Sequence, residues 1–84
     1  MKHFASSDFW ACFETLPDAV KELARRNYEL LKENPHHPSL HFKKIKTYRS
    51  VRIGLHYRAL GIEAPDGVLW FWIGKHTDYD KLLS

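Results

Sequence analysis

Hydrophobic residues along this chain change their spacing once, from a helical to a strand-like period. In residues 18–33 they return every three or four positions, and charged residues fill the opposite face. This spacing predicts an amphipathic helix. Asn34 precedes Pro35 and ends the helix, because a residue before proline is displaced from helical backbone angles. The aromatic residues between Phe9 and Phe13 give a shorter segment an apolar side, so residues 7–33 predict a helical hairpin.

The sequence also offers residues that can cap both helices. Ser7 or Asp8 can cap the first helix, because a short polar side chain accepts a hydrogen bond from a free backbone N–H at a helix start. Pro17 suits the first turn of the second helix, and Thr15 with Asp18 can form a capping box there.

Beyond Pro38 the hydrophobic residues follow the period of two that is typical of strands. Turn residues at 54–56 and 64–67 separate neighbouring strands, which are therefore expected to be antiparallel. The last strand is apolar throughout, which predicts a central position covered on both faces. The fold class is α+β, with an N-terminal helical hairpin packed on a curled four-stranded antiparallel sheet and a short C-terminal helix or tail at 78–83. The expected strands are residues 40–45, 48–53, 57–62 and 68–73.

Size and composition indicate one globular domain spanning residues 1–84. Hydrophobic residues make up 44% of the chain and aromatic residues 14%, which is too apolar for a disordered chain. These residues are too dispersed for a membrane span, so no membrane partner is expected. The single cysteine, Cys12, excludes an internal disulfide framework and is expected to pack as a small hydrophobe. The first residues lack the apolar core of a secretion signal, and we expect a cytoplasmic location.

Charge is distributed unevenly, although the formal net charge is only +3. No acidic residue occurs between Glu33 and Glu63, and histidines are interleaved with the basic residues there. A basic segment inside a folded sheet predicts a binding face for a polyanion, and nucleic acid is the expected partner. A solvated lysine-rich surface is the alternative interpretation. The basic residues of this segment are Lys43, Lys44, Lys46, Arg49, Arg52 and Arg58.

Three short segments, in order, carry a resemblance to a known family. In residues 50–60 an Arg-Ile-Gly strand end is followed by a strand that begins Tyr57-Arg58, which resembles a hairpin of the RelE/ParE toxin superfamily. Residues 42–45, Phe-Lys-Lys-Ile, resemble the element before that hairpin, and residues 73–76, Ile-Gly-Lys-His, resemble the closing strand. The resemblance covers nearly the whole chain and implies two helices followed by a sheet.

The resemblance also implies a function. Members of the superfamily are toxins of bacterial type II toxin–antitoxin pairs, so a cognate antitoxin protein is the expected partner. One branch cleaves mRNA on the ribosome, with contacts to ribosomal RNA, and the other inhibits DNA gyrase. The histidines beside the basic sheet favour the endoribonuclease, which needs neither metal nor cofactor. A gyrase inhibitor and a catalytically inactive binding protein are the alternatives.

The resemblance, together with chemistry, names candidate catalytic residues. The family pattern implies Lys43, Arg58 and His76, and Arg52 can join Arg58 in holding a phosphate because guanidinium binds it bidentately. Histidine suits proton transfer near neutral pH. His76 is the first candidate, with an ordinary exposed histidine as the alternative, and His56 or His41 could serve the second transfer. Cross-strand pairing with acids is the alternative role of the two arginines.

The remaining candidates would bind RNA without cutting it. Lysine and arginine side chains contact backbone phosphates, and tyrosine rings stack on unpaired bases. The role of the C-terminal tyrosine of RelE itself is not transferred, because Leu82 falls near that position and Tyr79 lies three residues earlier. No metal site is expected from the histidines at 36, 37 and 41 or from His76 with its neighbouring aspartates. The expected RNA-binding residues are Lys44, Lys46, Arg49, Tyr57, Tyr79 and His56.

Overall fold

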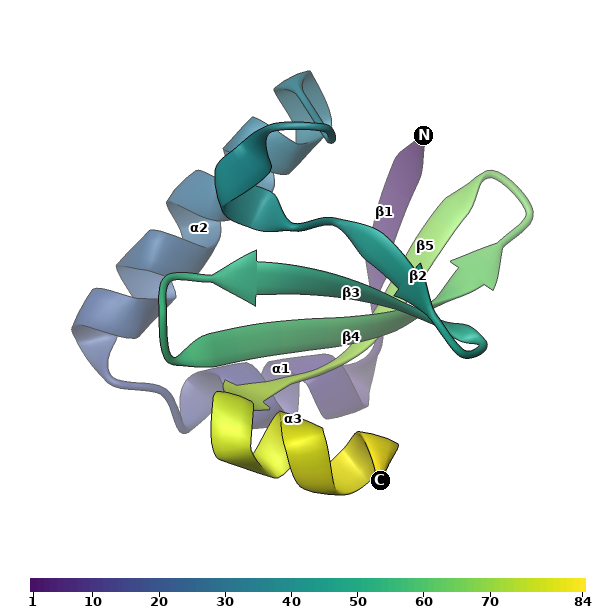
Figure 1. Cartoon of the computed structure of the whole chain (residues 1–84). Coiled ribbons are helices and arrows are strands. Elements are labelled where there is room, and N and C mark those ends of the chain that lie inside the picture. The colour runs from purple at the N-terminus through teal and green to yellow at the C-terminus, as the bar shows by residue number, and fades with distance from the viewer.

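The computed structural model describes residues 1–84 and has an α+β fold (Figure 1). None of its helices is long and apolar enough to cross a membrane. In chain order the elements are β1 (Lys2–Ala5), α1 (Ser7–Glu14), α2 (Asp18–Glu33), a 3-10 helix η1 (Pro38–Leu40), β2 (Lys43–Ile45), β3 (Tyr48–Ile53), β4 (Tyr57–Ala64), β5 (Gly67–Lys75) and α3 (His76–Leu83).

The sheet has five strands in the order β1-β5-β4-β3-β2, and it is not strongly curled. The strands β2 to β5 are antiparallel neighbours, as the sequence predicts. The prediction of a curled four-stranded antiparallel sheet was wrong in its strand count and curvature, because β1 adds a fifth strand parallel to β5. Since β1 has only four residues and one partly buried side chain, it shows no alternation that could reveal it.

Helices cover both faces of the sheet. Val51, Ile53 and Ala59 belong to the hydrophobic core with Phe13 of α1 and Leu31 of α2. Side chains of alternate residues in a strand point to opposite faces, so Ser50 faces away from that core. Ser50 contacts Tyr79 of α3, which places α3 on the other face. In Figure 1, α1 lies behind the sheet and α3, in yellow, lies in front of it.

The two helices of the N-terminal hairpin begin where the pattern predicts, but their caps differ. Ser6 caps α1, since its side chain accepts a hydrogen bond from the Phe9 N–H at 3.2 Å. The expected cap at Ser7 or Asp8 was one or two residues too late. Thr15 does not cap α2 either, because its hydroxyl donates to the Cys12 carbonyl at 2.7 Å and α2 has no side-chain cap.

The strands begin and end close to their predicted positions. Leu40 is fully buried but belongs to η1, so β2 is shorter than expected. The turn after β3 contains Gly54, whose φ of 64° is a left-handed conformation that favours glycine. β5 is an interior strand with two neighbours, although β4 occupies the centre of the sheet. The turn between β3 and β4 lies at the same end of the sheet as the last residues of β5, because Tyr57 pairs with Lys75.

The cap of α1 gives a stability prediction. Changing Ser6 to Ala removes the acceptor for the Phe9 N–H and should lower the free energy of unfolding by about 1 kcal/mol. Ser7→Ala is the matched control, because Ser7 is exposed and its side chain makes no hydrogen bond within the chain, so the change should be within about 0.5 kcal/mol. Urea unfolding of both variants measures the difference, and an equal effect of both would contradict the assignment of Ser6 as the cap.

Candidate functional site

Two arginines face each other across β3 and β4. Arg52 and Arg58 are register partners, and both have the strand parity that places their side chains on the α3 face. Each is half-buried. Arg58 is also the register partner of Gly74, two residues before His76 begins α3. The structure therefore brings Arg52, Arg58 and His76 to one end of the sheet, next to the turn that contains His56.

This arginine pair makes no ion pair with an acidic side chain, because the ion pairs of the chain involve other residues. Arg58 Nη1 donates to the carbonyls of Tyr57 at 2.7 Å and Gly54 at 3.4 Å. Arg52 Nε is buried and has no hydrogen-bond acceptor within the chain. Burial and the charge of Arg52 lower the pKa of Arg58, and Tyr79 and Asp80 of α3 oppose this shift without reversing it.

The two charges persist despite this environment, because a guanidinium remains protonated at any physiological pH. An anion that accepts hydrogen bonds from both guanidinium groups stabilises the two adjacent cations. It can also supply an acceptor for the buried donor that lacks one. The ordinary alternative for these arginines is pairing with Glu63, Asp66 or a helix acid. Pairing with Glu63 or Asp66 does not occur, and the helix acid Asp80 makes its ion pair with His76 and not with Arg58. The pair is suited to a phosphate group.

Helix α3 is fixed to this face by a buried pair of hydroxyls. Tyr79 is 7% exposed and Ser50 is 2% exposed, and their side-chain oxygens lie 2.8 Å apart. At the far end of the helix, Lys46 Nζ donates to the carbonyl of Leu83. Tyr79 was expected to stack on an RNA base, but its ring is enclosed between α3 and the sheet in this arrangement. Its role here is to hold α3, and Lys46 holds the helix end.

His76 is held in place from three sides. Its backbone N–H donates to the carbonyl of His56 at 2.7 Å, which joins the start of α3 to the β3–β4 turn. Its Nδ1 lies 3.6 Å from a carboxylate oxygen of Asp80, one helical turn later. Its ring is stacked with the Tyr79 ring, with centroids 6.2 Å apart and planes 19° apart. The imidazole remains 45% exposed, so a substrate can reach it.

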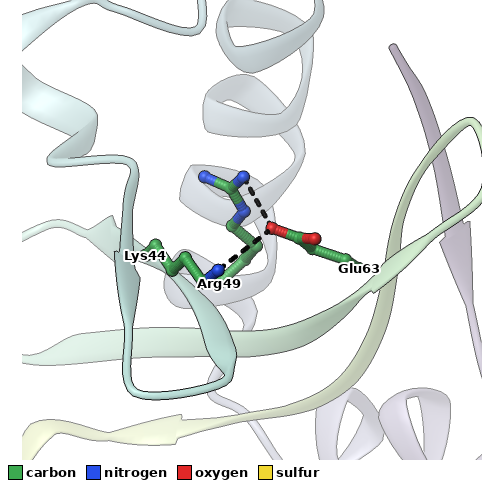
Figure 2. A network of polar contacts seen from close by, with 3 residues as sticks. All are labelled: Lys44, Arg49 and Glu63. Atoms are coloured by element: carbon green, nitrogen blue, oxygen red, sulfur yellow. Dashed lines mark hydrogen bonds and ion pairs between the residues drawn. The ribbon is translucent and has the colours of Figure 1, made fainter.

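The basic segment divides between the two faces of the sheet. Lys44 and Arg49 are register partners, and Arg49 has the parity of the core residues Val51 and Ile53. Figure 2 shows both side chains converging on Glu63, which lies 2.9 Å from Arg49 and 3.9 Å from Lys44. The single basic face suggested by the sequence is thus two surfaces, and this one is partly neutralised.

Lys43, a candidate catalytic residue, and Tyr57, a candidate RNA-binding residue, lie on different faces of the sheet. Lys43 is exposed and pairs in register with Ser50, so it belongs to the α3 face with the arginine pair. Tyr57 packs against the hydrophobic core on the opposite face. No group of three histidine, cysteine or acidic side chains is close enough to hold a metal ion.

Sequence reasoning missed Ser50, the residue that seats α3. Its position between Tyr48 and Arg52 does place it on the arginine face by alternation. Its partner, however, lies 29 residues away in a segment that could have been a helix or a tail. Only the packed structure pairs the two hydroxyls.

Comparison with known proteins identifies relatives of this architecture. The family model described as the ParE-like toxin domain matches residues 18–81. A search of curated proteins gave no significant match. The matched segment runs from the start of α2 into the last turn of α3 and includes the arginine pair, His76 and Tyr79.

Solved structures of toxins share the fold. A chain of the RelB–RelE antitoxin–toxin complex of Methanococcus jannaschii superposes with a TM-score of 0.73 at 15% identity, over 96% of this chain and 99% of that one. A copper-bound mutant toxin of Helicobacter pylori gives 0.65 at 18% identity, over 93% and 97%. The isolated RelE toxin of E. coli gives 0.63 at 11% identity, over 95% and 93%. At these identities the likeness establishes the fold alone.

The buried hydroxyl pair yields a second stability prediction. Tyr79→Phe or Ser50→Ala alone leaves one buried hydroxyl without its partner and should cost about 1–2 kcal/mol. The double variant should cost less than the sum, because the two groups lose the same interaction. Tyr48→Phe is the control, since no hydrogen bond of its hydroxyl occurs within the chain. Urea unfolding measures all four variants, and strictly additive losses would contradict the pairing.

Proposed function

The chain belongs to the family of ParE-like toxin domains and is a type II toxin–antitoxin toxin of the RelE/ParE fold, and we propose that it acts as a metal-independent endoribonuclease that cleaves mRNA on the ribosome. The observation that carries this proposal is the arginine pair, Arg52 and Arg58, which lacks a carboxylate partner and lies beside an accessible histidine. A phosphodiester supplies the anion that the two guanidinium groups lack.

The chemistry needs three functions. The 2′-hydroxyl of one nucleotide attacks the adjacent phosphorus while a base removes its proton. The bond to the 5′ oxygen then breaks, and an acid protonates that oxygen, leaving a 2′,3′-cyclic phosphate and a 5′-hydroxyl. Negative charge grows on the phosphoryl oxygens in between, and nearby cations that are already in place stabilise it. Arg52 and Arg58 have this role in the proposal.

His76 carries out one of the proton transfers. Histidine is the side chain best suited to proton transfer near neutral pH. The Asp80 carboxylate lies next to Nδ1, so Nε2 is the ring nitrogen that meets the substrate. His56 is exposed in the adjoining turn and is the candidate for the other transfer, because the hydrogen bond from the His76 N–H to its carbonyl keeps the two residues close.

Basic residues outside this centre bind RNA in the proposal. Lys43 is exposed on the face of the arginine pair and is suited to a flanking phosphate or to the reacting one. Lys44 and Arg49 lie on the other face, so they can contact ribosomal RNA but not the scissile phosphate. Their ion pairs with the exposed Glu63 are weak enough to exchange for phosphate contacts.

A cognate antitoxin is the expected protein partner. A chain similar in fold to this one was crystallised in a complex of the RelE toxin with its RelB antitoxin. An acidic amphipathic segment could neutralise this toxin by covering the arginine pair or by displacing α3 from Ser50. Binding through such charges weakens at high salt, whereas a purely apolar interface does not.

One observation favours a second function. The matching family model is the one described as ParE-like, and inhibition of DNA gyrase is the alternative that the sequence resemblance implied. In that case the arginine pair would be a protein-docking surface, and His76 would have no chemical role. A catalytically inactive binding protein is distinguished from both by the absence of cleavage and of gyrase inhibition.

The proposal predicts the behaviour of His76→Ala. Loss of a positioned acid–base group should reduce mRNA cleavage in programmed ribosomal complexes by about 10²–10⁴-fold. Arg58→Gln should also reduce it strongly, because the growing charge then loses a cation. His36→Ala is the matched control, since His36 is exposed and its ring makes no hydrogen bond within the chain, so cleavage should persist. Mapping of mRNA ends measures all of these.

A gyrase supercoiling assay on the same samples separates the alternatives. Intact mRNA together with inhibited gyrase would overturn the endoribonuclease assignment and support the ParE-like function. Cleavage that is unchanged in both His76→Ala and Arg58→Gln would place the active centre elsewhere on the molecule.

A further inference from the structure

Strand β1 has one partly buried side chain beyond its backbone ladder. Of its four residues only His3 is partly buried, while Lys2, Phe4 and Ala5 are exposed. The strand lies at the edge of the sheet, so it has a single neighbour, β5. Short edge elements with few buried contacts open more readily than the core of a domain. The contacts of His3 therefore decide how firmly β1 is attached.

His3 accepts a hydrogen bond from the indole of Trp70. Trp70 Nε1 lies 3.1 Å from His3 Nδ1, and the two ring planes differ by 18°. An indole N–H can only donate, so Nδ1 must be unprotonated and the proton of the neutral ring is on Nε2. A doubly protonated imidazolium has no acceptor for Trp70. The contact therefore exists only with the neutral histidine.

The surroundings of His3 also disfavour a positive charge. The Met1 amino group and Lys32 of α2 are the charges that act on it, and both are cationic. Tyr28 of α2 packs edge-on against its ring at 5.8 Å. Burial lowers the pKa of His3, and the two cations lower it further. Glu29, a carboxylate of α2, is paired with Lys32.

His3 also lines an apolar cavity of about 330 Å³. β1 forms one wall of it, and α1, α2 and the core face of the sheet form the others. No aspartate or glutamate lines it, and Arg25 is its other charged residue. α1 and β5 contribute only apolar residues and the indole of Trp70. Protonated His3 would thus meet no acidic group in this cavity.

We propose that His3 is a pH-sensitive latch, which holds β1 against β5 when neutral and releases it when protonated. Release opens the wall of the apolar cavity and leaves β5 as the edge strand, with the backbone groups that pair with β1 free. Mild acidity would therefore open the apolar cavity and free the β5 edge while the remaining four strands stay paired. This device does not depend on the proposed ribonuclease activity.

The sign of the effect follows from proton linkage. Released His3 has an ordinary pKa of about 6.5, whereas in the closed sheet the pKa is lower. As the pH falls below about 6.5, the open state binds the proton first, so opening becomes easier until the pH passes the closed-state pKa. Within that window the opening constant grows by up to about tenfold per pH unit. At pH values above this window, His3 is neutral in both states, and the attachment of β1 no longer changes with pH through His3.

Hydrogen exchange by NMR tests the latch. Protection factors of the β1 amides and of the Trp70 indole N–H should be lower at about pH 5 than at about pH 7.5 in the wild type. His3→Gln supplies a carbonyl acceptor that does not titrate, so its β1 protection should not fall. His36→Gln is the matched control, because His36 is exposed and its ring makes no hydrogen bond within the chain, and it should behave as wild type.

Two results would overturn the proposal. One is β1 protection in the wild type that is the same at both pH values, and the other is an equal loss in His3→Gln. An NMR titration of the His3 ring gives an independent check that does not rely on a variant. A midpoint at or above about 6.5 would show that the closed sheet does not exclude the proton, and the latch would be wrong.

Discussion

The register of β3 against β4 fixes which side chains meet on each face of the sheet. Val51, Ile53 and Ala59 must pack on α1 and α2, because they supply the apolar surface that the small core requires. Alternation then forces Ser50, Arg52 and Arg58 onto the other face. A slip of one residue would reverse both sets, so core packing and the arginine pair are specified by the same constraint.

This constraint has an electrostatic consequence. Arg52 and Arg58 are placed side by side by strand pairing and not by attraction, so the hydrophobic core offsets the cost of their repulsion. Glu63 lies where it pairs with Lys44 and Arg49 on the opposite face. The two arginines without an ion pair are therefore left together at the end of the sheet where α3 begins. There the Ser50–Tyr79 pair seats the helix that carries His76.

Local patterns predicted most of the fold. The three- and four-residue spacing of α2, the alternation of β3 and β4, and the turn at Gly54 were each visible in a short window of sequence. β1 was missed because its pairing with Gly67–Trp70 spans more than sixty residues and its side chains are mostly exposed. The contacts of Ser50 and His3 could not be predicted either, because their partners are distant in the chain. Alternation could place Arg52 and Arg58 on one face, but it could not show that Lys44 and Arg49 face the other way with Glu63.

Arg52 and Arg58 form a phosphate site in the proposed function, and an NMR titration measures binding at this site. Arginine Nε–H signals can be followed while a short 2′-deoxy oligonucleotide, which cannot be cleaved by 2′-hydroxyl attack, is added. Phosphate binding at the pair should give saturable shifts of the Arg52 and Arg58 signals, and raising the salt concentration should remove them. Shifts confined to Arg49, with Arg52 and Arg58 unchanged at saturation, would contradict it.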